Sequence, residues 1–182
     1  HALGELEELD IHIDDTARRS VGEVRGKCRE LIADGGLDLL VIDYLQLMQG
    51  DGEKRYEIVT AISRDLKVMA GELDIPIIVL SQLSRASEGR ADPRPKISDL
   101  RESGALEQDA DIIAFLHRAH HREGGATEFF IEKARNVDGG STYLTLHREL
   151  TKFEDGGDPP PPPSKEEKKA QNDAAKTRAI IR

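Results

Sequence analysis

The chain has 182 residues, with 37% hydrophobic and 34% charged side chains, which gives room for one domain with a real core. No apolar run approaches the roughly 18 residues that a membrane helix would need, so we expect neither a membrane span nor an uncleaved secretory signal. The formal net charge of −9 argues against a protein whose whole surface binds nucleic acid, although it leaves room for a local basic track.

The first predicted elements are a short strand and a capped helix. Residues 11–14 alternate apolar and polar side chains and predict a strand. Ser20 and Glu23 have the spacing of a capping box, and apolar residues then recur on one helical face until two glycines end the pattern. Cys28, the single cysteine, lies within that pattern and cannot form an internal disulfide. We interpret it as a small buried hydrophobe in a protein of the reducing cytoplasm.

The middle of the chain alternates strands and a helix. Residues 37–43 are almost continuously aliphatic, which is typical of a strand buried on both faces of a parallel sheet. A loop at residues 50–53 precedes apolar residues that recur at helical spacing from 59 to 73. Residues 77–80 predict the next buried strand. The polar stretch 84–98 predicts a long loop, a feature that in a compact domain is either functional or disordered.

The last third predicts antiparallel strands and a tail. Residues 112–116 predict a third buried strand, and residues 128–134 and 141–147 flank a Val-Asp-Gly-Gly sequence that is typical of a hairpin turn. From Asp155 onward a proline run and a Lys/Glu/Ala-rich end predict disorder. We therefore divide the chain into a folded portion, residues 1–154, and a disordered tail, residues 155–182.

Alternating strands and helices that close on an antiparallel hairpin indicate an α/β domain, in which ligands bind at the carboxyl ends of the strands. Asp43 and Gln82 each follow such a strand. A carboxylate at this position can hold hydrated Mg²⁺, and an amide can sense a phosphate or orient water, but each residue equally fits an ordinary polar strand end. The sequence contains no G-x-x-x-x-G-K-[ST] loop to bind the phosphates of a nucleotide.

Three segments, residues 42–48, 80–85 and 99–111, occur in the order in which bacterial and phage replicative helicases of the DnaB type carry similar motifs. The likeness to this family extends over roughly residues 4–153. The resemblance implies a RecA-like three-layer fold with a mainly parallel central sheet and a C-terminal antiparallel hairpin. It also implies ATP and Mg²⁺ as cofactors and single-stranded DNA as a partner.

The resemblance assigns a role to each of several residues. It makes Asp43 the Walker B magnesium residue and Gln82 the nucleotide-sensing strand end. It places Arg101, Glu102 and Gly104 in a loop that faces a central channel and contacts the DNA backbone. A cation and a glycine suit phosphate contact, whereas the carboxylate would need a neighbouring cation. From the residues alone, Arg101 and Glu102 also fit an ordinary surface ion pair.

The resemblance also implies a site shared between subunits. Lys133 and Arg135 lie two apart on a predicted strand and project to the same side. By resemblance they reach into the nucleotide site of a neighbouring subunit, with Arg135 as an arginine finger. Spacing alone favours a solvated edge strand with alternating charges. For His117, His120 and His121 we expect a charged loop rather than a metal site, because no cysteines or matched carboxylates accompany them.

We therefore interpret the chain as the C-terminal part of a cytoplasmic replicative DNA helicase. The complete protein would form a homo-hexamer that couples ATP hydrolysis to movement along single-stranded DNA, with primase and a helicase loader as further partners. Because the phosphate loop is missing and the sequence opens at His1, we expect a fragment that does not hydrolyse ATP alone. Two alternatives stay open: a recombination or repair ATPase on the same scaffold, and a non-catalytic remnant that binds DNA.

Overall fold

The structure is a computed structural model that describes residues 10–84, 90, 92–100, 103–118 and 126–156. Its helices and strands are α2 (Val21–Asp34), β1 (Leu40–Ile42), α3 (Arg55–Leu73), β2 (Ile77–Val79), α4 (Ser103–Asp109), β3 (Ile112–His117), β4 (Thr127–Ala134), β5 (Ser141–His147) and β6 (Lys152–Asp155). Short 3₁₀ turns are η1 (Leu45–Leu47), η3 (Ile97–Asp99) and η4 (Arg148–Leu150). The predicted tail lies outside the described residues from 157 onward.

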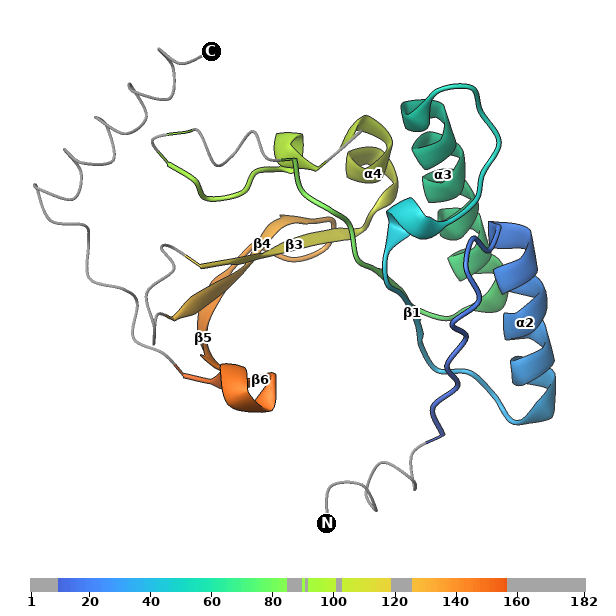
Figure 1. Ribbon diagram of the computed structural model, residues 1–182, viewed down its shortest axis with the longest axis horizontal. Coiled ribbons are helices and arrows are strands. Elements are labelled where there is room, and N and C mark those ends of the chain that lie inside the picture. The colour runs from blue at the N-terminus through green and yellow to red at the C-terminus, as the bar shows by residue number, and fades with distance from the viewer. Residues whose placement is uncertain (1–9, 85–89, 91, 101–102, 119–125, 157–182) are drawn as a thin grey trace, which may run out of the picture.

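Strands of two kinds make up the sheets. β1 and β2 pair in parallel, whereas β3, β4, β5 and β6 form an antiparallel sheet in that order. Figure 1 shows α2 and α3 beside the parallel pair, with α4 between α3 and the antiparallel sheet. The predicted α/β class is confirmed, and so is the hairpin, which is formed by β4 and β5. Among the described helices, none combines the length and the apolar character that crossing a bilayer requires.

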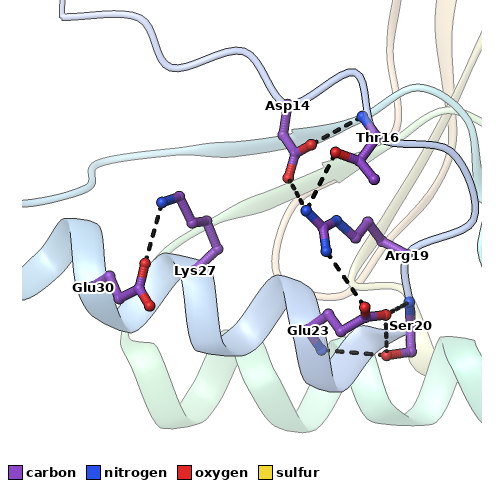
Figure 2. A network of polar contacts seen from close by, with 7 residues as sticks. All are labelled: Asp14, Thr16, Arg19, Ser20, Glu23, Lys27 and Glu30. Atoms are coloured by element: carbon purple, nitrogen blue, oxygen red, sulfur yellow. Dashed lines mark hydrogen bonds and ion pairs between the residues drawn. The ribbon is translucent and has the colours of Figure 1, made fainter.

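The helix α2 begins at the predicted capping box. The Ser20 Oγ atom accepts a hydrogen bond from the Glu23 amide at 3.3 Å, and the Glu23 carboxylate accepts one from the Ser20 amide at 2.8 Å. Figure 2 shows Arg19 beside this box, between Asp14 and Glu23. The buried Cys28 thiol lies on the inner face, where burial raises its pKa. The predictions for the helix and for the burial of the cysteine are confirmed.

The predicted strand at residues 11–14 is wrong. This segment pairs with no described strand, and the side chain of Ile13 is 88% exposed. Instead the Asp14 carboxylate accepts a hydrogen bond from the Thr16 amide at 2.9 Å, a local turn that replaces pairing with another strand. Alternation in four residues cannot produce a strand where no partner edge is available.

The first hydrophobic core lies between α2, α3 and the parallel strands. Its fully or almost fully buried side chains are Val21, Leu45, Val59, Ile62, Leu66 and Met69. Four of these come from α3 and follow the spacing predicted from the sequence. Glu72 of α3 also lies within 3.5 Å of Arg25 and Arg29 of α2, which adds exposed ion pairs to the helix contact. The predicted helix is therefore confirmed as the central element of this core.

The parallel pair is apolar on both faces but buried on only one. The register aligns Ile42 with Val79, and the side chains on that face pack against the first core. On the opposite face Val41 is 54% exposed and Ile78 is 53% exposed. The prediction that these strands are buried on both faces is wrong, because the described helices cover one face of the pair.

A second core forms between β3, β4 and the chain just before α4. It contains Leu100, Ile113, Phe115 and Phe130, and the two phenylalanine rings lie 5.4 Å apart between centroids. The predicted strand at residues 112–116 is confirmed, but only alternate side chains are buried. In the turn between β4 and β5, a Cβ atom added at Gly139 would lie 2.7 Å from a backbone oxygen of β4, so this position requires glycine.

Candidate functional site

Asp43 and Gln82 follow the carboxyl ends of the two parallel strands, where the sequence placed them. Asp43 comes directly after β1, Gln82 comes three residues after β2, and both are exposed. Because β1 and β2 are parallel and in register, their carboxyl ends lie at the same edge of the pair. The Asp43–Tyr44 peptide bond is cis. The edge presents the Asp43 carboxylate and the Gln82 side-chain amide to solvent, and the carboxylate could face a phosphate only with a cation between them.

Gln46 ties this edge together. Its side-chain oxygen accepts a hydrogen bond from the Gln82 amide at 3.2 Å, and its side-chain nitrogen donates to the Ser81 hydroxyl at 3.0 Å. Arg55 in turn donates to the backbone oxygen of Gln46 at 2.6 Å. We assigned no role to Gln46 from the sequence, because its separation of 36 positions from Gln82 hides the contact. The side-chain amide of Gln46 therefore fixes the backbone at Gln82.

The donors at this edge suit magnesium better than a transition metal. Within the described ranges, no group of three or more histidine, cysteine, aspartate or glutamate side chains could hold a metal ion. Of the three histidines weighed above, His120 and His121 lie outside these ranges. Mg²⁺ keeps most of its waters and takes one or two carboxylates together with substrate phosphates. A single exposed carboxylate such as Asp43 fits that pattern.

Lys133 and Arg135 meet the carboxyl end of α4. The Lys133 ammonium donates to the backbone oxygens of Glu107 and, at 2.8 Å, of Ala110. The Arg135 guanidinium donates to the backbone oxygen of Gln108 at 2.6 Å. Both cations therefore lie on the same side of β4, as their spacing predicted, although Arg135 is one residue beyond the strand. Cations are favourable here because the last turn of a helix carries partial negative charge.

Asp111 completes this cluster of charges. Its carboxylate lies 3.4 Å from Arg135 Nε and 2.5 Å from Lys67 Nζ of α3. The hydrogen bond from Lys67, and then the charges of Lys67, Arg135 and Lys133, hold the pKa of Asp111 below its ordinary value. Ser63 of α3 also donates to Asp109 at 2.7 Å. α4 is thus fixed from one side by α3 and from the other by the end of β4.

Gly104 is exposed on α4, whereas Arg101 and Glu102 lie outside the described residues. A Cβ atom added at Gly104 would meet nothing within 4 Å, so packing does not require glycine at this position. Glycine inside a helix costs about 0.5–1 kcal/mol relative to alanine. The sequence did not predict α4, because its seven residues carry little of the apolar periodicity that marks a longer helix.

The candidate residues form two groups rather than one. Among the described residues, no hydrogen bond or ion pair joins Asp43 or Gln82 to Lys133 or Arg135. α3 is the element that links them, because it packs on the parallel strands through the first core and holds α4 through polar contacts. In a site shared between two subunits, one chain would contribute the first group and its neighbour the second, so the two groups of a single chain would lie apart.

Comparison with known proteins places this arrangement in a family. A family model described as the DnaB-like helicase C terminal domain matches residues 1–155. The replicative DNA helicase DnaB of Geobacillus stearothermophilus is 48% identical over 160 residues, and the replicative DNA helicase DnaC of Bacillus subtilis is 47% identical over 160 residues. Each alignment covers 84% of this chain and 35% of the relative. The chain therefore spans about a third of the length of these relatives.

Solved structures agree with the sequence comparison. A DnaB-like replicative helicase, solved in a study of its interactions with primase, matches with a TM-score of 0.79 and 41% identity over 86% of this chain and 39% of its own. A second solved structure, an ATPase domain, matches with the same TM-score, identity and coverage of this chain, and over 58% of its own length. The fold is therefore that of the DnaB-like helicases. With a family match over residues 1–155 and relatives at 47–48% identity, the chain belongs to the DnaB-like helicase C-terminal domain family.

Proposed function

We propose that this chain supplies the magnesium-binding, nucleotide-sensing and DNA-contacting part of an ATP-dependent DNA helicase motor. The observation that carries the proposal is the edge at which Asp43 and Gln82 follow two parallel strands in register, in a chain of this family. A recombination or repair ATPase would use a similar edge, but the relatives named above are replicative helicases.

At this edge the chain's own residues would bind Mg²⁺ and orient the terminal phosphate or the attacking water. The Asp43 carboxylate would hold Mg²⁺ through a water molecule, and Gln82 would present its amide to the terminal phosphate or to the attacking water. Bound Mg²⁺ supplies positive charge that neutralises the nucleotide phosphates. Gln46 keeps Gln82 in place because its side-chain oxygen accepts a hydrogen bond from the backbone amide of Gln82. The 182 residues contain no phosphate-binding loop, so ATP hydrolysis needs a segment that carries one.

Lys133 and Arg135 act on a neighbouring subunit in this proposal. Both cations sit at the end of β4, apart from the edge of their own parallel strands. A guanidinium placed against a developing negative charge accelerates phosphoryl transfer by about 10³–10⁵. The separation of the two groups supports a site shared between subunits, and we propose a homo-hexameric ring in which each chain completes the site of the next.

Single-stranded DNA is the proposed track. Arg101 supplies charge for the DNA backbone, and Gly104 leaves room for a phosphate to approach the exposed start of α4. Glu102 would be held by a neighbouring cation. A primase and a helicase loader are further proposed partners, and the first is named together with one of the solved relatives. We place the complete protein in the cytoplasm.

The experiment mixes this chain with a family segment that carries the phosphate loop and measures ATP hydrolysis stimulated by single-stranded DNA. We expect turnover only in the mixture, with a loss of about 10³-fold or more for Arg135→Ala. Arg148→Ala is the matched control, because Arg148 is exposed on η4 at the far end of β5.

Each other outcome counts against a defined part of the proposal. Turnover by the chain alone would mean that its residues contain a phosphate site of another kind. An inactive mixture that still binds DNA would leave a binding module in place of a motor. Equal losses for Arg135→Ala and Arg148→Ala would remove the role of Arg135 in a shared site.

A further inference from the structure

Asp99 is the only buried charged residue in the part of the chain that the structure describes. It is 3% exposed and lies two residues before Arg101. Taking a carboxylate out of water is costly unless it is paired and hydrogen-bonded, so such a residue needs an explanation. Neither the proposed nucleotide edge nor the proposed DNA contact uses it.

The carboxylate is fully compensated by its neighbours. The guanidinium of Arg90 donates to both of its oxygens, at 2.8 and 2.5 Å, in the two-pronged geometry that makes strong pairs. The Lys96 amide donates to the same carboxylate at 2.9 Å. These hydrogen bonds, that of Arg90 foremost, hold the pKa of Asp99 below its ordinary value.

The same pair fixes a length of backbone. Arg90 also donates to the backbone oxygens of Asp92 at 3.3 Å and Arg94 at 2.9 Å. The backbone oxygen of Asp99 accepts from the Ser84 amide at 2.7 Å. Together with this main-chain bond, the Arg90 guanidinium and the Asp99 carboxylate hold together three parts of the segment that leads from β2 to α4.

The fixed segment ends where the proposed DNA contact begins. Leu100, directly after Asp99, is buried against Phe115 and Phe130 in the second core. On the other side of residues 101–102, α4 is held by Lys133 and Arg135. The backbone is thus anchored directly before residues 101–102, at Leu100, and again at the carboxyl end of α4, at residues 107–110.

We propose that Asp99 and Arg90 are positioning residues, which hold the backbone that enters the DNA-contacting stretch 101–104. The inference rests on the proposed function for the identity of that stretch. It adds a cause for the position of the backbone directly before that stretch: a bidentate ion pair with a buried carboxylate, which holds Asp99 in place. Asp99 itself does not touch DNA, because its carboxylate is buried.

The first test needs no DNA. Amide hydrogen exchange is measured on the full 182-residue chain, with Asp99→Asn compared with Glu154→Gln. Glu154 is an exposed carboxylate of β6 that pairs with Lys152 at 2.8 Å, so its variant loses the same charge elsewhere. We expect exchange at the Ser84 and Lys96 amides to rise about tenfold or more in Asp99→Asn and to stay within about twofold in the control. Unchanged exchange in Asp99→Asn would overturn the inference.

The second test separates positioning from general stability. Binding to a fluorescent oligothymidylate is measured at low salt for Asp99→Asn, Arg101→Ala and the double variant. We expect both single variants to weaken binding, and we expect the double variant to bind no more weakly than Arg101→Ala. Losses that multiply in the double variant would show that Asp99 acts independently of Arg101 and would overturn the inference.

Conservative substitution supplies a third comparison. Arg90→Lys keeps the charge but loses the two-pronged geometry, so we expect it to raise the exchange rates at the same amides as Asp99→Asn, by a smaller factor. If Arg101→Ala alone leaves binding unchanged, the proposed DNA contact fails, and the exchange rates still decide whether Asp99 fixes the segment. The two failures are therefore distinguishable.

Discussion

Replacing Arg94 by methionine removes a charged contact between the segment before α4 and the strand β4. The Arg94 guanidinium donates to the two carboxylate oxygens of Glu128 at 3.0 Å each, and it lies 3.5 Å from the centroid of the Phe130 ring. Its side chain is 38% exposed, whereas that of Glu128 is 15% exposed. The methionine variant keeps the unbranched aliphatic stem but leaves the Glu128 carboxylate without its main partner.

The size of the effect follows from these contacts. Hydrogen bonds to charged groups contribute about 1.5–3 kcal/mol when shielded, and the exposure of Arg94 reduces the pair to about 1–2 kcal/mol. The guanidinium over the ring adds about 0.5–1 kcal/mol. We therefore expect Arg94→Met to lower the free energy of unfolding by about 2–3 kcal/mol, measured by urea unfolding followed by circular dichroism.

A control substitution and a second background test whether the loss comes from the pair of Arg94 and Glu128. Arg148→Met removes an exposed arginine and should change the free energy of unfolding by no more than about 0.5 kcal/mol. In a Glu128→Gln background the loss from Arg94→Met should shrink, because the charge pair is already broken. A loss below about 0.5 kcal/mol, or the same loss in both backgrounds, would refute the assignment of stability to this pair.

Three other predictions concern packing and pH. Gly139→Ala should cost about 1–3 kcal/mol because its Cβ atom meets a backbone oxygen, whereas Gly140→Ala meets nothing within 4 Å; equal unfolding midpoints in urea would contradict this. Met69→Ala should cost about 2–5 kcal/mol in the same assay and the exposed Val68→Ala far less, so similar losses would argue against the first core. The pKa of Asp99 lies below its ordinary value of 3.8, so the pair with Arg90 stabilises the protein above that pH, and the contribution is lost as the pH falls through the folded pKa. The difference in unfolding free energy between wild type and Asp99→Asn should therefore shrink below about pH 4, and a constant difference would disprove the linkage.

Local signals in the sequence were sufficient for most of the elements. The Ser20 and Glu23 spacing located the start of α2, and the apolar spacing of residues 59–73 located α3, because both depend on neighbours within one or two turns. The hairpin of β4 and β5 follows from two strand-like runs around a glycine turn. For the same reason Asp43 and Gln82 could be placed at strand ends from the sequence alone.

Contacts between distant residues could not be predicted in the same way. The pair of Arg94 and Glu128 spans 34 residues, and Lys133 reaches the end of α4 across more than twenty. A single sequence does not state which charges meet across such separations. The ion pair of Arg90 and Asp99 was also missed, because its nine-residue separation falls in an irregular segment without a helical or strand period. Burial of the parallel strands was overestimated, because an aliphatic run shows that a strand could be covered on both faces and does not show that it is.

The open face of the parallel pair has a practical consequence for work with this chain in solution. Leu39, Val41, Ile78 and Leu80 place apolar surface in contact with water, and such patches promote self-association as concentration rises. Alternation along each strand means that the opposite side chains, which build the first core, would not be touched by changes here. Val41→Lys would therefore raise solubility without changing the side chains of the first core, which would give a preparation suited to the exchange and binding measurements.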